Sequence, residues 1–214
     1  MQYINQKTNL IDCSDHGPGT ELFVVEGQSA SMSVARVRDA RFQAVLPMQG
    51  KPMNATKASR RSVERNDWYR ALVQALGIGW EPTSAAGLRF ERVLLLFDPD
   101  ADGIHCGLLV LLFFERYLLP VLDDNRLSVV KAPMFELRAD GYHDCLHAYS
   151  EEHLRRLRDA LEAKGIDHTH QRFRGLASLS DTALVETCID PASRTAYLLE
   201  RSDAAQAQAV FGRK

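Results

Sequence analysis

The sequence predicts an α/β fold in which helices flank a mostly parallel central sheet. Short apolar or β-branched runs alternate with helix-like segments along most of the chain, and this order is typical of parallel strands joined by helical crossovers. In the run "RVLLLF" (92–97) every residue after Arg92 is apolar, as expected for a strand buried on both faces of such a sheet. The chain of 214 residues is long enough for one large domain with a smaller appendage.

Local signals define the individual elements. The predicted strands are 21–27, 42–51, 92–97, 126–137 and 194–200. The predicted helices are 29–40 with Ser29 as N-cap, 55–76 with Gly77 as C-cap, 103–122, 150–165 with Ser150 as N-cap, and 181–191. The segment 103–122 is apolar on nearly every side, so we expect that helix to be buried.

These elements divide the chain into four parts. We expect an N-terminal arm over 1–20, the α/β domain over 21–140, a small α+β extension over 141–200 and a frayed tail over 201–214. The net charge of -2 excludes a protein that is basic over its whole surface, although a local basic groove is compatible with it.

Targeting and redox signals point to the cytoplasm. The N-terminus lacks an apolar core of signal-peptide length, and the four cysteines are too far apart for a zinc site or a disulfide framework. The most apolar stretch, 108–114, is interrupted by Glu115 and Arg116, so it is too short to span a membrane. We therefore predict a cytoplasmic protein with no membrane partner.

Two predicted strands end in carboxylates. Glu26 ends the first strand, and Asp98 follows the third, with Asp100 and Asp102 at a spacing of two residues. Side chains two apart in an extended chain point the same way, and Pro99 keeps the chain extended at this point. Because parallel strands end at one edge of a sheet, the four acids would repel one another unless a cation lay among them. Hard oxygen ligands of this kind predict Mg²⁺.

The same D-x-D-x-D-G pattern opens the calcium loop of EF-hands. That loop needs a glutamate at its twelfth position, which here is Leu109, and a helix before it, where this sequence has a predicted strand. A solvated acidic turn that caps the helix beginning at Gly103 is a simpler alternative, because aspartates are common and favourable at helix N-termini.

Basic residues complement the acids. Lys51 follows a glycine turn, and Arg172 and Arg174 lie on one side of the segment "QRFRGL" before Gly175, where they are suited to DNA phosphates. His105, in the first turn of a predicted helix, is either a phosphate contact or a helix cap. Each basic side chain alone is also compatible with a solvated surface. Together with a metal-type acidic site, they predict a polyphosphate ligand such as DNA.

Five segments, in this order, resemble the Toprim region of type IIA DNA topoisomerases, which is the C-terminal half of gyrase B and of the topoisomerase IV E subunit. They are "TELFVVEGQSA" (20–30), "FQAVLPMQGKPMNA" (42–55), "LLLFDPDADGIHCGLLVLLFF" (94–114), "LSVVKAPMFEL" (127–137) and "QRFRGLASLSDTALVETCIDPASRT" (171–195). Several independent motifs in the family's order make this resemblance specific, whereas a D-x-D-x-D-G motif alone is weak.

The resemblance implies a Toprim, Rossmann-like fold and a role in DNA cleavage and religation. It implies Glu26, Asp98 and Lys51 as catalytic residues, and Glu26, Asp98, Asp100 and Asp102 as ligands of Mg²⁺, for which Mn²⁺ is expected to substitute. In the family a DNA phosphodiester is attacked by a tyrosine of the A subunit, and the metal stabilises the 3′-oxygen. The glutamate moves the proton on that oxygen.

The sequence departs from the family pattern at several points. Gln28 replaces an aspartate, and "GLASL" (175–179) replaces G-L-G-E-M. We find neither the family's ATPase and transducer regions nor its winged helix with the attacking tyrosine, so we expect two partners, a separate ATPase polypeptide and a gyrase A-like subunit. Tyr117 lies within the predicted buried helix, which favours a structural role for it.

Three functions stay open. The first is the DNA cleavage–religation module of a split type IIA topoisomerase, which binds DNA and supplies the metal site. The second is a Toprim nuclease or nickase that uses water in place of tyrosine. The third is a non-catalytic mimic of gyrase B that binds or inhibits gyrase A. The resemblance favours the first.

Overall fold

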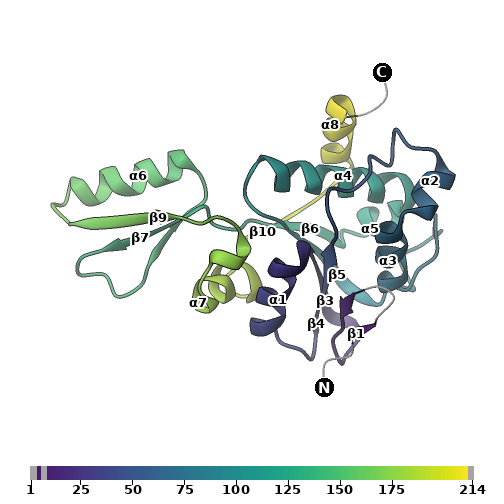
Figure 1. Cartoon of the computed structure of the whole chain (residues 1–214), viewed down its shortest axis with the longest axis horizontal. Coiled ribbons are helices and arrows are strands. Elements are labelled where there is room, and N and C mark those ends of the chain that lie inside the picture. Colours follow the sequence, from purple (N-terminus) through teal and green to yellow (C-terminus); the bar gives the residue numbers. More distant parts are fainter. Residues whose placement is uncertain (1–3, 6–8, 212–214) are drawn as a thin grey trace.

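The computed structural model describes residues 4–5 and 9–211, which form two sheets with helices around them (Figure 1). The larger sheet has seven strands, in the spatial order β1 (Ile4–Asn5), β2 (Leu10–Ile11), β4 (Gln43–Met48), β3 (Gly17–Glu26), β5 (Phe90–Leu96), β6 (Leu127–Val130) and β10 (Ala196–Leu198). The smaller sheet has three strands, in the order β8 (Leu146–Ala148), β7 (Phe135–Ala139) and β9 (His168–Arg172).

The centre of the larger sheet is parallel. Strands β4, β3, β5 and β6 run in one direction, and the antiparallel strands β2 and β10 flank them. Phe23 in β3 pairs with Val45 on one side and with Leu94 on the other. The predicted α/β fold with a mostly parallel central sheet is therefore confirmed.

Helices cover both faces of this sheet. One face carries α2 (Arg60–Arg65), α3 (Asp67–Leu76), α4 (Ala101–Tyr117), α5 (Leu119–Asp123) and α8 (Arg201–Phe211). The other carries α1 (Gly27–Val37) and α7 (Asp181–Leu184), which continues as a π-helix over Val185–Ile189. Alternate residues of β3 enter the two cores: Leu22 and Val24 face the first group, and Phe23 and Val25 the second.

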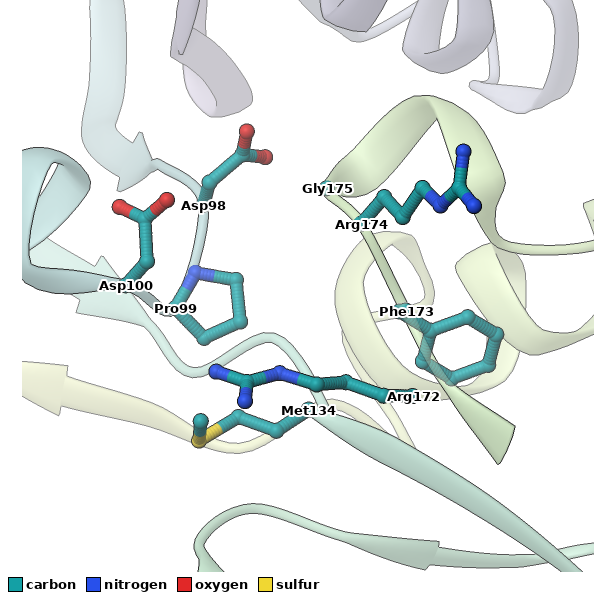
Figure 2. Close-up of a pocket in the computed structure, with 8 residues that line it drawn as sticks. All are labelled: Asp98, Pro99, Asp100, Met134, Arg172, Phe173, Arg174 and Gly175. Carbon is teal, nitrogen blue, oxygen red and sulfur yellow. The ribbon is translucent and has the colours of Figure 1, made fainter. Parts of the chain in front are cut away.

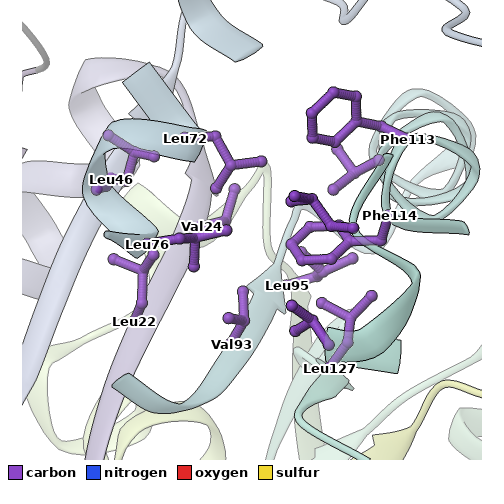
Figure 3. Packing of buried hydrophobic residues seen from close by; sticks show 14 of the residues in the cluster. Leu22, Val24, Leu46, Leu72, Leu76, Val93, Leu95, Phe113, Phe114 and Leu127 are labelled. Atoms are coloured by element: carbon purple, nitrogen blue, oxygen red, sulfur yellow. The ribbon is translucent and has the colours of Figure 1, made fainter. Parts of the chain in front are cut away.

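The first core is the larger of the two. Figure 3 shows Phe114 of α4 next to Leu95 of β5, and Phe113 and Val93 belong to the same cluster of buried side chains. Burial on both faces explains why β5 is apolar from Val93 to Leu96 and why α4 is apolar on nearly every side.

The smaller sheet projects from this body (Figure 1). Helix α6 (Glu151–Glu162) covers one of its faces, and Phe135, Leu137, Leu154 and Leu161 form part of a separate small core there. The chain leaves the larger sheet after β6, builds this unit, and then returns to form α7 and β10. At its base the outgoing and returning segments are joined, because the Phe173 N–H donates to the Met134 carbonyl at 2.9 Å.

The prediction of one strand over 126–137 is wrong. The segment forms β6 in the larger sheet and β7 in the smaller one, with no strand over 131–134. Pro133 lies in this interruption, and proline cannot donate a backbone hydrogen bond to a sheet. The C-terminal part of the chain is therefore divided differently from the predicted extension, with 135–172 in the small unit and β10 back in the main sheet.

Several other elements also differ from the predicted ranges. Gly27 has a φ of +77°, so the chain turns directly from β3 into α1, and Ser29 lies inside the helix instead of capping it. Strand β3 begins at Gly17, within the predicted arm, and β2 joins the main sheet. Residues 201–211 form α8 in place of a frayed tail, because the small side chains of Ala204 and Ala207 are buried within the fold.

Within the described ranges, no helix has the combined length and apolarity that crossing a membrane requires.

Candidate active site

Three adjacent parallel strands bring the predicted catalytic residues to one edge of the main sheet. Glu26 is the last residue of β3, Asp98 lies two residues beyond β5, and Lys51 lies three residues beyond β4. Because β3 pairs with both β4 and β5 in parallel register, these strands end side by side. The carboxyl-edge rule for parallel sheets predicted the meeting of Glu26 and Asp98, whereas Lys51 was predicted from its glycine turn and from the family resemblance.

The turn from β5 into α4 is crowded. Asp100 is the N-cap of α4, and its carboxylate accepts a hydrogen bond from the Gly103 N–H at 2.8 Å. A Cβ atom on Gly103 would lie 2.0 Å from the Asp98 carbonyl oxygen, so no larger residue fits here without moving the backbone. The glycine is thus required by the close approach of the Asp98 carbonyl oxygen.

The four acids are neighbours, but they do not converge on one point. Among the described residues, no three of these carboxylates have oxygens within 4.8 Å of one another. Asp100 is engaged as a helix cap, and Asp102 is exposed and forms an ion pair with Lys51 at 3.3 Å. A cation bound by several of them would therefore require rotation of their side chains.

The electrostatics of the site disfavour a full set of negative charges. Burial raises the pKa of Glu26, and the charges of Asp98, Asp100 and Asp102 raise it further, while Lys51 lowers it. Burial also raises the pKa of Asp98, against a hydrogen bond from the Leu176 N–H that lowers it. A hard divalent cation fits this donor set, because all four ligands are carboxylates and one lysine is too little positive charge to balance them.

Asp98 contacts a distant segment that the sequence analysis did not connect with it. The Leu176 N–H donates to Asp98 Oδ1 at 2.8 Å. A Cβ atom on Gly175 would lie 2.6 Å from Asp98 Oδ2, so the backbone at Gly175 packs directly against the carboxylate. The motif "QRFRGL" drew attention to its arginines, and nothing local in the sequence shows that its Gly–Leu pair meets an aspartate 78 positions earlier.

Two cavities flank this contact. One, of about 380 Å³, is lined by Asp98, Pro99, Asp100, Met134, Arg172, Phe173, Arg174 and Gly175 (Figure 2). The other, of about 290 Å³, is lined by Glu26, Ser29, Ala30, Asp98, Arg174, Gly175, Leu176, Ala177 and Ser178. Asp98, Arg174 and Gly175 line both, so these three residues form a wall shared by the two cavities.

The two predicted DNA-binding arginines are neighbours but point apart. Figure 2 shows Arg172 extending toward Pro99 and Asp100, and Arg174 extending in the opposite direction. The prediction that they lie on one side of the segment is therefore wrong. Arg172 lies over the Phe135 ring at 5.6 Å and is 3.6 Å from Glu151. The exposed Arg174 makes no ion pair with any described residue.

His105 was predicted in the first turn of its helix, but α4 begins at Ala101, so His105 is the fifth residue of the helix and lies in its second turn. Another ring covers one face of its imidazole. Its imidazole stacks on Phe211 of α8, with ring centroids 4.8 Å apart. The Phe211 carbonyl also accepts a hydrogen bond from Asn54 at 2.9 Å. Helix α8 is thereby held between α4 and the segment that follows Lys51.

Tyr117 is buried, with an exposed fraction of 2%. Its ring packs between Phe113 and Trp80, with centroid distances of 5.5 and 5.7 Å. The side chain belongs to the first core, which confirms the structural interpretation made from the sequence.

A second group of metal-type ligands lies before β3. Ligand atoms of Asp12, Cys13 and His16 come within 4.8 Å of one another, although the cysteine spacing alone did not suggest such a group. Arg89 already supplies a positive charge here, since its guanidinium is 2.6 Å from Asp12 Oδ2 and 2.5 Å from His16 Nε2. Burial raises the pKa of the Cys13 thiol to about 11, which disfavours the thiolate that a metal needs.

Known proteins share these segments. A family model described as "Toprim domain" matches residues 21–131, more than half of the chain. The B subunit of DNA gyrase from Archaeoglobus fulgidus is 36% identical over 207 residues, covering 94% of this chain and 31% of that protein. The B subunit of DNA topoisomerase 4 from Bacillus subtilis is 32% identical over 191 residues, covering 88% of this chain and 29% of that protein. The chain thus spans about a third of the length of these relatives.

The matched region contains Glu26, Lys51 and the aspartate turn, and the main sheet has the predicted α/β arrangement around them. The chain therefore belongs to the Toprim family and is similar to the Toprim region of the B subunits of DNA gyrase and DNA topoisomerase 4.

Proposed function

We propose that this chain is the DNA cleavage–religation module of a type IIA topoisomerase and depends on Mg²⁺. The observation that carries the proposal is the meeting of Glu26, Lys51 and Asp98 at the ends of three adjacent parallel strands. Toprim domains generally bind a divalent metal, and relatives with this region are subunits of DNA gyrase and topoisomerase 4.

In this proposal Asp98, Asp100 and Asp102 hold the cation, together with Glu26. When bound, the cation supplies positive charge against the DNA phosphate and the departing 3′-oxygen. Mn²⁺ is expected to substitute, because it also accepts carboxylate oxygens.

Glu26 is suited to proton transfer at the 3′-oxygen. Its burial and its acidic neighbours raise its pKa from the usual carboxyl range toward the operating pH, where general acid–base catalysis is most effective. Lys51 reaches this edge from β4 and would contact a phosphate after leaving Asp102.

The DNA contacts proposed here are Lys51, His105, Arg172 and Arg174. The two arginines line the cavities beside Asp98, where a guanidinium can bind phosphate oxygens. His105 would use its ring nitrogens, because one face of its ring stacks on Phe211.

The proposed partners are DNA, a gyrase A-like subunit that bears the attacking tyrosine, and a separate ATPase subunit. The relatives are named as B subunits, which supports an assembly with at least one other polypeptide. Among the described residues the only tyrosine on α4, Tyr117, is buried and unsuited to attack on DNA.

The test combines the purified chain with a gyrase A protein, supercoiled plasmid and Mg²⁺. We expect DNA cleavage that leaves protein covalently attached, detected after denaturation with detergent, and its loss in Asp98→Ala and Glu26→Ala. A matched control is Asp140→Ala, which removes an acid outside the site. The proposal is wrong if no covalent complex forms although the gyrase A protein is active with its own gyrase B.

Other outcomes of the same assay support the alternatives. Nicking by the chain alone that is lost in Asp98→Ala would identify a Toprim nuclease. Binding to gyrase A without cleavage, with inhibition of the native gyrase, would identify a mimic.

A further inference from the structure

We propose that Gly175 and Leu176 are positioning residues for Asp98, and that the turn Arg174–Ser178 couples DNA contact to the metal site. This inference rests on the proposed function, in which Asp98 is a metal ligand. Within the described ranges, the Leu176 N–H at 2.8 Å is the one hydrogen-bond donor to the Asp98 carboxylate. Outer partners of this kind fix the orientation of a carboxylate that binds a metal.

Gly175 allows this approach. Its φ of +149° is in the region that residues with a side chain rarely adopt, and a Cβ atom would lie 3.0 Å from Asp98 Cγ as well as 2.6 Å from Oδ2. Any side chain at this position would therefore push the carboxylate away from the Leu176 N–H.

The turn is held in shape from within. The Ser178 hydroxyl donates to the Gly175 carbonyl at 2.6 Å and accepts from the Arg174 N–H at 2.9 Å. Leu176 anchors the turn, since its side chain is 1% exposed and packs in the core between the sheet and helices α1 and α7. The hydrogen bond to Asp98 thus comes from a backbone that is fixed on both sides.

The same turn carries Arg174, which lines both cavities next to Asp98. A phosphate bound by Arg174 and a cation bound by Asp98 would therefore both contact the turn Arg174–Ser178, the first through the Arg174 side chain and the second through the hydrogen bond between Asp98 and Leu176. In this proposal each ligand holds that turn in the position that favours binding of the other, and the coupling is reciprocal.

The test compares two variants of the full chain that lose the same buried side chain. Leu176→Pro removes the N–H donor, whereas Leu176→Ala keeps it. Position 176 begins a short 3₁₀-helix, Leu176–Ser178, and proline is tolerated at the first position of a helix because that N–H has no partner within the helix. Mn²⁺ binding is measured from the electron paramagnetic resonance signal of the free ion, without DNA or any partner protein.

We expect Leu176→Pro to bind Mn²⁺ about 10–100-fold more weakly than Leu176→Ala, as is usual on loss of an outer partner of a metal ligand. Equal affinities of the two folded variants would overturn the inference. Ser178→Ala, at an exposed position, serves if the proline variant does not fold. It should weaken Mn²⁺ binding and reduce the gain in affinity on adding a short DNA duplex, and unchanged values would also overturn the inference.

Wild-type and Asp98→Ala proteins separate this inference from the proposed function. If the wild type binds no Mn²⁺, or if Asp98→Ala binds it equally well, the proposed metal site itself is wrong. If only Asp98→Ala loses binding while the Leu176 and Ser178 variants keep it, the metal site stands and the positioning role is wrong.

Discussion

The two sheets of this molecule differ in how they are covered. The seven-stranded sheet has a hydrophobic core on each face, whereas the three-stranded sheet has one small core beneath α6. In the large sheet, Glu26 is the last residue of β3 and Asp98 follows β5, and both strands are buried between helices. The segment that returns from the small sheet brings Gly175 to Asp98. The candidate site therefore combines carboxylates at the edge of the large sheet with a wall formed by the segment that returns from the small sheet.

The first prediction concerns the point where the chain rejoins the large sheet. Arg194 forms an ion pair with Glu21 of β3, and their side chains are only 3% and 6% exposed. Arg194→Ala leaves the buried Glu21 carboxylate without a positive partner among the described residues, with only the hydrogen bond that the Gln43 amide donates to it at 2.9 Å, so we expect a loss of about 3–5 kcal/mol in the free energy of unfolding. Chemical denaturation followed by circular dichroism measures it.

A double variant provides the control for this prediction. Glu21→Gln with Arg194→Met leaves neither charge unpaired and should recover most of the stability. If the single variant is as stable as the wild type, the returning segment contributes little to the stability of the large sheet. The proposed difference in stability between the large and the small sheet would then be wrong.

The second prediction concerns the small sheet. Leu137 is fully buried beneath α6, so Leu137→Ala should cost about 2–5 kcal/mol within that unit. Regions with few buried contacts unfold locally. We therefore expect this variant to exchange amide hydrogens faster over 135–172, with little change in β3 and β5. Leu95→Ala, in the large core, should instead increase exchange throughout. Equal acceleration everywhere in both variants would show that the two sheets unfold as one.

The third prediction has the smallest effect and concerns charge at the site. Burial and Asp100 raise the pKa of Asp98, so folding favours its protonated form. Stability from this group is present below the usual carboxyl range and is lost as the pH rises through the raised pKa. In metal-free buffer, Asp98→Asn should therefore be more stable than the wild type at neutral pH by about 0.5–1 kcal/mol. The carboxamide oxygen can still accept from Leu176.

The pH dependence separates charge from packing. The advantage of Asp98→Asn should disappear at about pH 3, where the wild-type carboxyl group is protonated as well. Urea unfolding at the two pH values measures both stabilities. A gain that is the same at both would assign the effect to shape and not to charge.

Local patterns predicted much of the large sheet and its acidic edge. The run 92–97 with Asp98 at its end showed a buried strand that ends in a charge, and the parallel order then placed Glu26 nearby. Patterns of this kind contain information only about residues that are close together along the chain. They could not show that Pro133 separates strands of different sheets, or that Gly175 meets Asp98, because those facts depend on the path of the chain between them. Helix α8 was not predicted, because the alanines on its buried side give only a weak apolar pattern in the sequence. Their small side chains nevertheless let the helix pack closely against the rest of the fold.

The residue at position 103 can distinguish related sequences that keep the aspartate turn intact from those that do not. The lack of a side chain on Gly103 leaves room for the Asp98 carbonyl oxygen, which would lie 2.0 Å from a Cβ atom. A natural variant with any other residue at this position must have rebuilt the turn that presents its aspartates, even if all of them are still encoded. In a genome survey, this one codon would therefore help to distinguish copies with an intact turn from copies that keep only the acidic motif.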